Sequence, residues 1–149
     1  MQGHNAQPRN EPGPELNRLA ERVIGAAIEV HRVLGPGYAE NVYEEALCLE
    51  LAARDVPFVR QPQVEVQYKG HAVGRARLDL LVADEIVVEL KAVEALNDTF
   101  KAQVISYLRA TGHELGLLIN FNVPVLRDGI RRLVLSTGSA SSALSAPLR

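Results

Sequence analysis

The chain has 149 residues, of which 47% are hydrophobic and 23% charged, with a formal net charge of −2. These values fit one soluble globular domain and argue against a constitutively basic nucleic-acid binder. A membrane-spanning helix is excluded, because no run approaches the roughly 18 apolar residues that it needs. The single cysteine, Cys48, cannot form an internal disulfide, and the amino-terminal residues lack the apolar segment of a secretory signal, so we expect a cytoplasmic protein.

Charge and composition vary along the chain. Residues 15–59 hold four Arg against eight acids, a balance of −4, whereas residues 60–135 hold ten Lys or Arg against nine acids, a balance of +1. The second part could therefore present a local basic surface. Residues 1–14 are polar and rich in Pro and Gly, and residues 136–149 are rich in Ser and Ala. We expect both to be disordered tails around a domain at residues 15–135.

Two helices are expected at the start of the domain. Apolar residues recur every three or four positions over residues 15–34, which predicts an amphipathic helix that ends at the Gly-Pro-Gly of residues 35–37. A second helix is expected at about residues 39–54, with Tyr43, Leu47 and Leu51 on one face.

The hydrophobic period then changes to that of strands. We expect strands at residues 64–69, 73–82 and 86–91, with a turn at residues 69–71. A helix at residues 98–110, capped by Asn97 or Asp98, precedes a buried strand at residues 115–121. A final hairpin is expected to turn at Asp128-Gly129 and return as residues 130–135. The order α-α-β-β-β-α-β-β predicts an α/β (α+β) fold with helices packed on a mixed sheet.

The third expected strand ends in an unusual way, with Glu89 and Lys91 on either side of Leu90. Alternation places Glu89 and Lys91 on the same face. A two-residue turn before this strand would put Asp79 of the preceding strand on the opposite face. An odd loop over residues 83–85, or a bulge, would instead pair Asp79 with Glu89 and Arg77 with Lys91. A site at Asp79 and Glu89 therefore requires an odd loop or a bulge.

Two adjacent carboxylates repel each other, which raises their pKa values unless a cation lies between them. Asp79 and Glu89 would suit a hard cation such as Mg²⁺ or Mn²⁺, with waters completing its shell. Lys91 could then orient or deprotonate a water that attacks a phosphodiester. The alternative is that Glu89 and Lys91 are solvated charges at a strand end.

The spacing D-x9-E-x-K, formed by Asp79, Glu89 and Lys91, resembles that of the PD-(D/E)xK nuclease superfamily. The resemblance implies a restriction-endonuclease-like α-β-β-β-α-β core, here with an extra amino-terminal helix and a carboxy-terminal hairpin. Gln103 and Tyr107, four residues apart on one helical face, resemble the Q-xxx-Y element that flanks the active site in some branches of that superfamily.

A closer resemblance covers roughly residues 16–135. The stretch GYAENVY at residues 37–43 matches G-x-x-E-x-x-Y, the signature of the GxxExxY protein family, which is placed within the same superfamily. By analogy, Glu40 is a further metal ligand or a water-orienting acceptor; its alternative role is a favourable charge at a helix N-terminus. Tyr43 is expected to be half in the core, with its hydroxyl at the edge of the site. His31 is either a satisfied, partly buried histidine or a group that faces the site.

These resemblances imply a metal-dependent nuclease with Mg²⁺ or Mn²⁺ and a DNA or RNA substrate. Phosphate contacts are expected from four basic residues: Arg75, Arg77, Lys101 and Arg109. A homodimer is one way for so small a chain to engage both strands of a duplex. The alternative function is a catalytically inactive module of the same fold that serves in binding or assembly, which the acidic first part of the chain favours.

Overall fold

The computed structural model describes residues 11–135. Its first helix, α1 (Pro14–Leu34), begins with a proline, whose missing N–H needs no partner at that position, and ends at Gly35, which has a φ of 67°. The second helix, α2 (Glu40–Ala53), follows after a short connection. Pro14, expected in the tail, is thus the first helical residue. Of the tails expected at residues 1–14 and 136–149, residues 1–10 and all of 136–149 lie outside the described residues.

The main sheet has five strands in the order β1-β4-β5-β6-β7. Their bounds are β1 (Phe58–Arg60), β4 (Leu80–Val82), β5 (Ile86–Lys91), β6 (Leu115–Asn120) and β7 (Ile130–Val134). Only β5 and β6 pair in parallel, and helix α3 (Asp98–Thr111) connects them, whereas a 3-10 turn, η1 (Leu126–Gly129), joins β6 to β7. This arrangement confirms the predicted mixed sheet.

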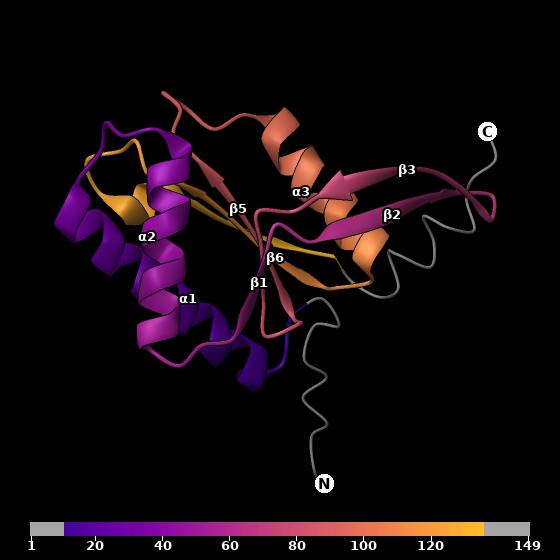
Figure 1. Ribbon diagram of the computed structural model, residues 1–149, viewed down its shortest axis with the longest axis horizontal. Helices are drawn as coiled ribbons and strands as arrows, with labels where there is room; N and C mark the ends of the chain where they lie inside the picture. The colour runs from indigo at the N-terminus through magenta and orange to yellow at the C-terminus, as the bar shows by residue number, and fades with distance from the viewer. Residues whose placement is uncertain (1–10, 136–149) are drawn as a thin grey trace, which may run out of the picture.

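A second, two-stranded sheet projects from the first as a ribbon formed by β2 (Gln63–Tyr68) and β3 (His71–Arg77) (Figure 1). The single strand expected at residues 73–82 is therefore wrong: it divides at Leu78 and Asp79 into β3, which pairs with β2, and β4, which pairs with β1 and β5. The sequence pattern also missed β1, because this strand has only three residues and lies between Pro57 and Pro62.

The helices cover the two faces of the main sheet. Ile86, Val88 and Leu90 belong to the large core that α1 and α2 complete on one face. Val87, on the alternate face, packs with Leu108 of α3. Figure 1 shows α1 and α2 together on one side and α3 on the other, beside the ribbon. Among the helices within residues 11–135, none combines the length and apolar character that crossing a membrane requires.

Helix α3 lies unusually close to the sheet at Gly116. A Cβ atom added there would lie 2.6 Å from the Cγ1 atom of Val104. A larger residue at position 116 would therefore push α3 away from β6.

We expect Gly116→Ala to lower the free energy of unfolding by about 1–3 kcal/mol, because the added methyl overpacks the interface between α3 and β6. Urea unfolding followed by circular dichroism measures this. Gly74→Ala is the matched control, since no atom lies within 4 Å of its added Cβ. Equal stability of the two variants would contradict the close packing.

Candidate active site

The connection between β4 and β5 fixes the register on which the site depends. Val82 pairs with Ile86 and Leu80 with Val88, so three residues, 83–85, form the loop. Ala83 and Asp84 both have positive φ angles, and the Glu85 N–H donates to the Val82 carbonyl at 2.9 Å. The required odd loop is confirmed. The register, continued by one pair, places Asp79 opposite Glu89.

Asp79 and Glu89 bind each other's strand through their side chains. The ladder between β4 and β5 ends at Leu80, because the preceding chain turns away into the ribbon. Beyond that point the Asp79 N–H donates to Glu89 Oε1 at 2.9 Å, and the Leu90 N–H donates to Asp79 Oδ2 at 2.8 Å. The carboxylates thus satisfy two backbone amides that have lost their ladder partners. Each uses one oxygen for this purpose.

Both carboxyl groups are held where their charge is unfavourable. Glu89 is only 4% exposed. Burial, followed by the charge of Asp79, raises the pKa of Glu89 to about 8, although the Asp79 N–H and Lys91 act in the opposite direction. Burial is also the main cause that raises the pKa of Asp79, against the lowering effect of the Leu90 N–H. Burial is thus the larger cause for both groups, and the charge of the neighbouring carboxylate adds to it at Glu89.

Lys91 ends β5 beside these carboxylates. Its Nζ atom lies 4.8 Å from the centroid of the Phe100 ring at the start of α3, and its carbonyl accepts the Phe121 N–H at 2.9 Å. The cation–π contact with Phe100 holds the ammonium group toward α3. The sequence did not indicate Phe100, since an aromatic residue in the first turn of a helix has no distinctive spacing.

Asn120 fixes the chain that follows Lys91, and sequence reasoning missed it. It is 1% exposed, and its side chain accepts the Val93 N–H at 3.0 Å and donates to the Val93 carbonyl at 2.9 Å. Asn120 also lies opposite Lys91 in the parallel register. An amide at the end of the apolar run LGLLI was the available signal.

Helix α2 brings two further acids to the site. The pKa of Glu40, its first residue, is raised by burial and then by the charge of Asp79, whereas Lys91 lowers it. Glu44, one turn later and 6% exposed, accepts hydrogen bonds from Arg60 Nε and Gln61 Nε2, both at 2.9 Å. The Gln61 N–H in turn donates to the Asp79 carbonyl at 2.8 Å. Glu44 therefore links α2 to the backbone of Asp79, a role that the sequence did not reveal.

Helix α3 places Tyr107 beside the carboxylates. Burial raises the pKa of Tyr107, and the charges of Glu89 and Asp79 raise it further, while a hydrogen bond with the Gln103 side chain lowers it. Gln103 and Tyr107 thus share one helical face at the edge of the site. Their catalytic roles stay predictions.

Tyr43 and His31 have structural contacts. Tyr43 is fully buried, not half-buried as expected, and its hydroxyl donates to the Gly35 carbonyl at 2.6 Å and accepts the Tyr38 N–H at 3.1 Å. His31 Nε2 lies 2.7 Å from the Val123 carbonyl. The structure therefore supports the satisfied histidine and does not bring His31 to the carboxylates.

The expected phosphate contacts do not gather at the carboxylates. Arg75 and Arg77 lie on the ribbon, where Arg77 pairs with Gln63 in β2, so its expected pairing with Lys91 is wrong. The cause is the division of the predicted strand at Leu78 and Asp79. On α3, the Lys101 Nζ atom lies 3.7 Å from Asp98 Oδ1, and Arg109 is exposed in the last turn.

The donor set fits a hard cation. Asp79 and Glu89 supply two carboxylates, and such a cation is commonly held by one or two carboxylates together with waters and substrate phosphates. Within residues 11–135, no group of three or more His, Cys, Asp or Glu side chains is arranged to hold a metal ion by itself. A bound ion would therefore depend on water and substrate for the rest of its shell.

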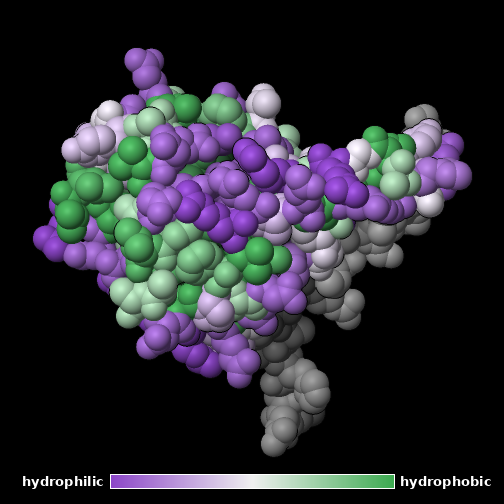
Figure 2. Space-filling view, in the orientation of Figure 1, coloured by the Kyte–Doolittle hydropathy of each residue, from purple (hydrophilic) through white to green (hydrophobic). Residues whose placement is uncertain are grey.

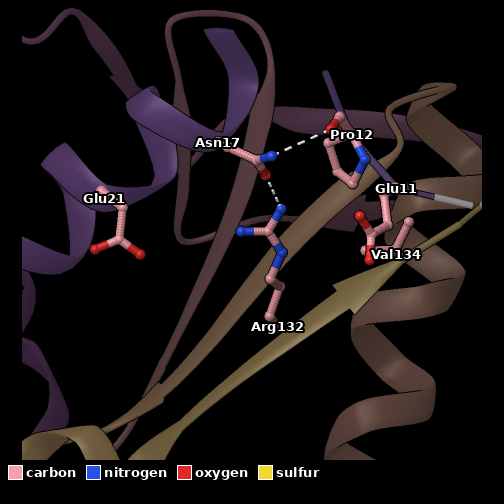
Figure 3. Close-up of a pocket in the computed structure, with 6 residues that line it drawn as sticks. All are labelled: Glu11, Pro12, Asn17, Glu21, Arg132 and Val134. Carbon is pink, nitrogen blue, oxygen red and sulfur yellow. Dashed lines mark hydrogen bonds between the residues drawn. The ribbon is translucent and has the colours of Figure 1, made fainter. Parts of the chain in front are cut away.

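A pocket of about 450 Å³ lies elsewhere, between the start of α1 and β7 (Figure 3). Within it Arg132 donates to Asn17 Oδ1, and Asn17 Nδ2 donates to the Pro12 carbonyl at 3.2 Å. These polar groups satisfy one another, and none of the predicted site residues lines the pocket.

The raised pKa of Glu89 predicts a pH-dependent stability. Below about pH 4.5 the carboxyl is protonated in both states; as the pH rises to about 8 the unfolded chain ionises first, so folding loses stability. We expect the metal-free protein to lose up to about 1.4 kcal/mol of unfolding free energy per pH unit in this range. Glu89→Gln should remove most of that slope. The smaller slope that remains in this variant should have the same sign, because the pKa of Asp79 is also raised.

Urea unfolding across this pH range in EDTA measures the slope. Glu65→Gln, at an exposed position on the ribbon, is the matched control and should keep the wild-type slope. A Glu89→Gln variant with the wild-type slope would show that burial of this carboxyl does not oppose folding.

Two comparisons with known proteins bear on this arrangement. A search of the curated proteins finds no match to the chain. A family model described as the PD-(D/E)XK nuclease superfamily matches residues 17–133, from the first turn of α1 to the last residues of β7. This match bears on the superfamily, and the closer resemblance to the GxxExxY family stays a prediction. Because the match spans both helices of the amino-terminal part, the candidate site and the whole sheet, the chain belongs to the PD-(D/E)XK nuclease superfamily.

Proposed function

We propose that the protein is a divalent-metal-dependent nuclease that hydrolyses phosphodiester bonds in nucleic acid. Nucleases of the superfamily generally use divalent metals. The observation that carries the proposal is the reciprocal contact of Asp79 and Glu89, in which each carboxylate binds a backbone amide of the other strand. Their remaining oxygens suit Mg²⁺ or Mn²⁺.

When bound, the ion would supply positive charge at the phosphate oxygens, where negative charge increases in the transition state. Asp79 and Glu89 would hold it, and Lys91 would orient the attacking water. That water forms the new bond to phosphorus as the bond to the leaving oxygen breaks. Glu40, whose pKa is raised by burial, would accept a hydrogen bond from the water and take its proton.

The supporting residues would maintain this arrangement. Gln103 and Tyr107 form the edge of the site on α3, and Lys101 and Arg109 would contact phosphates along the same helix. Asp79, Glu89 and Lys91 come from one chain, so the site does not require a homodimer, and the comparisons do not support one.

The alternative function is an inactive binding or assembly module of the same fold. The acidic part of the chain favours it, because Arg32 and Arg54, two of its four arginines, are held in ion pairs with glutamates. The energetics of the site favour the nuclease. Burial of two carboxylates whose pKa values are both raised costs stability, and a bound cation would offset that cost.

Isothermal titration of Mn²⁺, beside cleavage of labelled single- and double-stranded DNA and RNA, tests the proposal. We expect Asp79→Asn to lose both Mn²⁺ binding and cleavage. Lys91→Met should still bind Mn²⁺ but cleave about 10²–10⁴-fold more slowly, since it loses the group that orients the water.

Asp55→Asn is the matched control, because Asp55 is exposed and its positive φ of 55° is one that Asn also adopts. It should behave as the wild type does. Cleavage by Asp79→Asn at the wild-type rate would contradict the proposed site, and a wild-type protein that neither binds Mn²⁺ nor cleaves would favour the inactive module.

Metal binding should also depend on pH, because the ion displaces the proton that Glu89 retains below about pH 8. We expect Mn²⁺ affinity to rise by up to about tenfold per pH unit between about pH 6 and pH 8, with release of about one proton. Titrations in buffers of different ionisation enthalpy count that proton. Affinity that is independent of pH in this range would contradict the assignment of Glu89 as a ligand.

A further inference from the structure

The β2–β3 ribbon extends well beyond the body of the domain. Its pairing runs from Gln63 and Arg77 at the base to Tyr68 and His71 at the tip, with every residue of 67–75 exposed. Figure 2 shows it as a lobe that stands apart, hydrophilic along its length with a small hydrophobic group near its end. An isolated two-stranded ribbon is marginally stable. The ribbon therefore contributes little to the core beyond its base.

Among the described residues, helix α3 covers one face of the base. Val64 packs with the cluster formed by Leu108 and Tyr107 on α3. Val64 pairs with Ala76, so the neighbouring positions, Arg75 and Arg77, point to the opposite face. Both arginines are exposed. Within residues 11–135, the face that carries the two arginines is uncovered, while α3 supports the other face.

The ribbon as a whole carries positive charge, although Glu65 lies opposite Arg75 on the same face. Residues 63–77 contain Lys69, Arg75 and Arg77 against one acid, Glu65, a balance of +2. Among the described residues, none of these three cations forms an ion pair, and Arg75 donates only to Gln63, at 3.3 Å. At the tip, Tyr68 and Val73 are 59% and 61% exposed. Basic residues along the ribbon with apolar groups at its end suit a partner with phosphates around a groove.

The ribbon is continuous with the candidate site. Strand β3 leads through Leu78 directly into Asp79. At about 3.3 Å per residue, Arg75 lies about 13 Å along the chain from Asp79. The major groove of B-form DNA is about 12 Å wide and accepts a two-stranded ribbon. A phosphate on one strand at Asp79 and a phosphate across the groove at Arg75 are therefore compatible with one duplex.

We propose that the β2–β3 ribbon docks in the major groove of double-stranded DNA, with Arg75 and Arg77 on the phosphates, and so directs one strand to the Asp79–Glu89 site. The inference rests on the proposed function for that site, but its own subject is binding. The major groove of A-form RNA is too narrow for side chains to enter. Single strands offer no groove at all. The ribbon should therefore confer a preference for duplex DNA.

Fluorescence anisotropy of the full chain in EDTA, with labelled duplex DNA, single-stranded DNA and duplex RNA, reads binding without metal-dependent cleavage. We expect duplex DNA to bind most tightly. Arg75→Ala/Arg77→Ala should weaken duplex binding by at least about 10-fold at about 0.1 M salt, and should reduce the slope of log K against log salt by about 1.8.

Two further variants make this result specific. Arg18→Ala/Arg22→Ala removes the same charge from exposed positions on α1 and should bind as the wild type does. Arg75→Lys/Arg77→Lys keeps the charge and should retain binding to within about threefold. Circular dichroism and thermal unfolding confirm that each variant folds. Equal losses of DNA affinity in the ribbon and α1 variants would show that only net charge matters, and would overturn the proposal.

The proposal is also overturned if the ribbon variant binds duplex DNA normally, or if the wild type prefers single strands or duplex RNA, or binds no nucleic acid. A failure of the proposed function looks different. Ribbon-dependent binding of DNA by a protein that never cleaves with Mn²⁺ would retain the ribbon as a docking element and reject the nuclease. Asp79-dependent cleavage, together with normal DNA binding by the ribbon variant, would retain the nuclease and reject the ribbon as a docking element.

Discussion

The candidate site depends on an exchange of hydrogen-bond partners at the start of β4. One long hairpin, residues 58–82, supplies both the edge of the main sheet and the projecting ribbon, so its chain must leave β5 at Asp79. Two amides lose their ladder partners there, and a carboxylate from the opposite strand satisfies each of them. The exchange keeps the strands in register and fixes the orientation of both carboxylates before any ligand arrives.

In this exchange, the groups that accept the two backbone N–H bonds are carboxylates, which carry charge. A carbonyl in the same place would be neutral, whereas Asp79 and Glu89 are partly desolvated and repel each other. The surrounding contacts limit the consequences: Lys91 is held on Phe100, and Glu44 connects α2 to the backbone of Asp79 through Gln61. The site therefore holds two carboxylates whose charged forms are unfavourable, and shifts of this kind are common at functional sites.

The sequence predicted those parts of the molecule that local periodicity determines. The three α-helices, strand β5 and the buried run of β6 all follow from patterns within short windows. The sequence left the length of the loop before β5 open, and the register of β4 and β5 decides it. The division of residues 73–82 did not follow, because Arg77, Leu78 and Asp79 read as one continuous strand and only pairing with β2 diverts it. Asn120 and Glu44 were missed for the same reason: their partners lie 27 and 16 or 17 residues away in the chain.

Tyr43 anchors the first turn of α2 to the strands that carry the site. Its ring stacks on Phe121 with centroids 4.6 Å apart, and the Phe121 N–H bonds to the Lys91 carbonyl, so one aromatic pair ties the helix to the backbone of the site. Glu40, three residues earlier, takes no part in that anchor. The side chain at position 40 is thus free to change while the scaffold around it stays fixed. An exchange at position 40 would therefore leave intact the contacts through which Tyr43 holds α2 to the site.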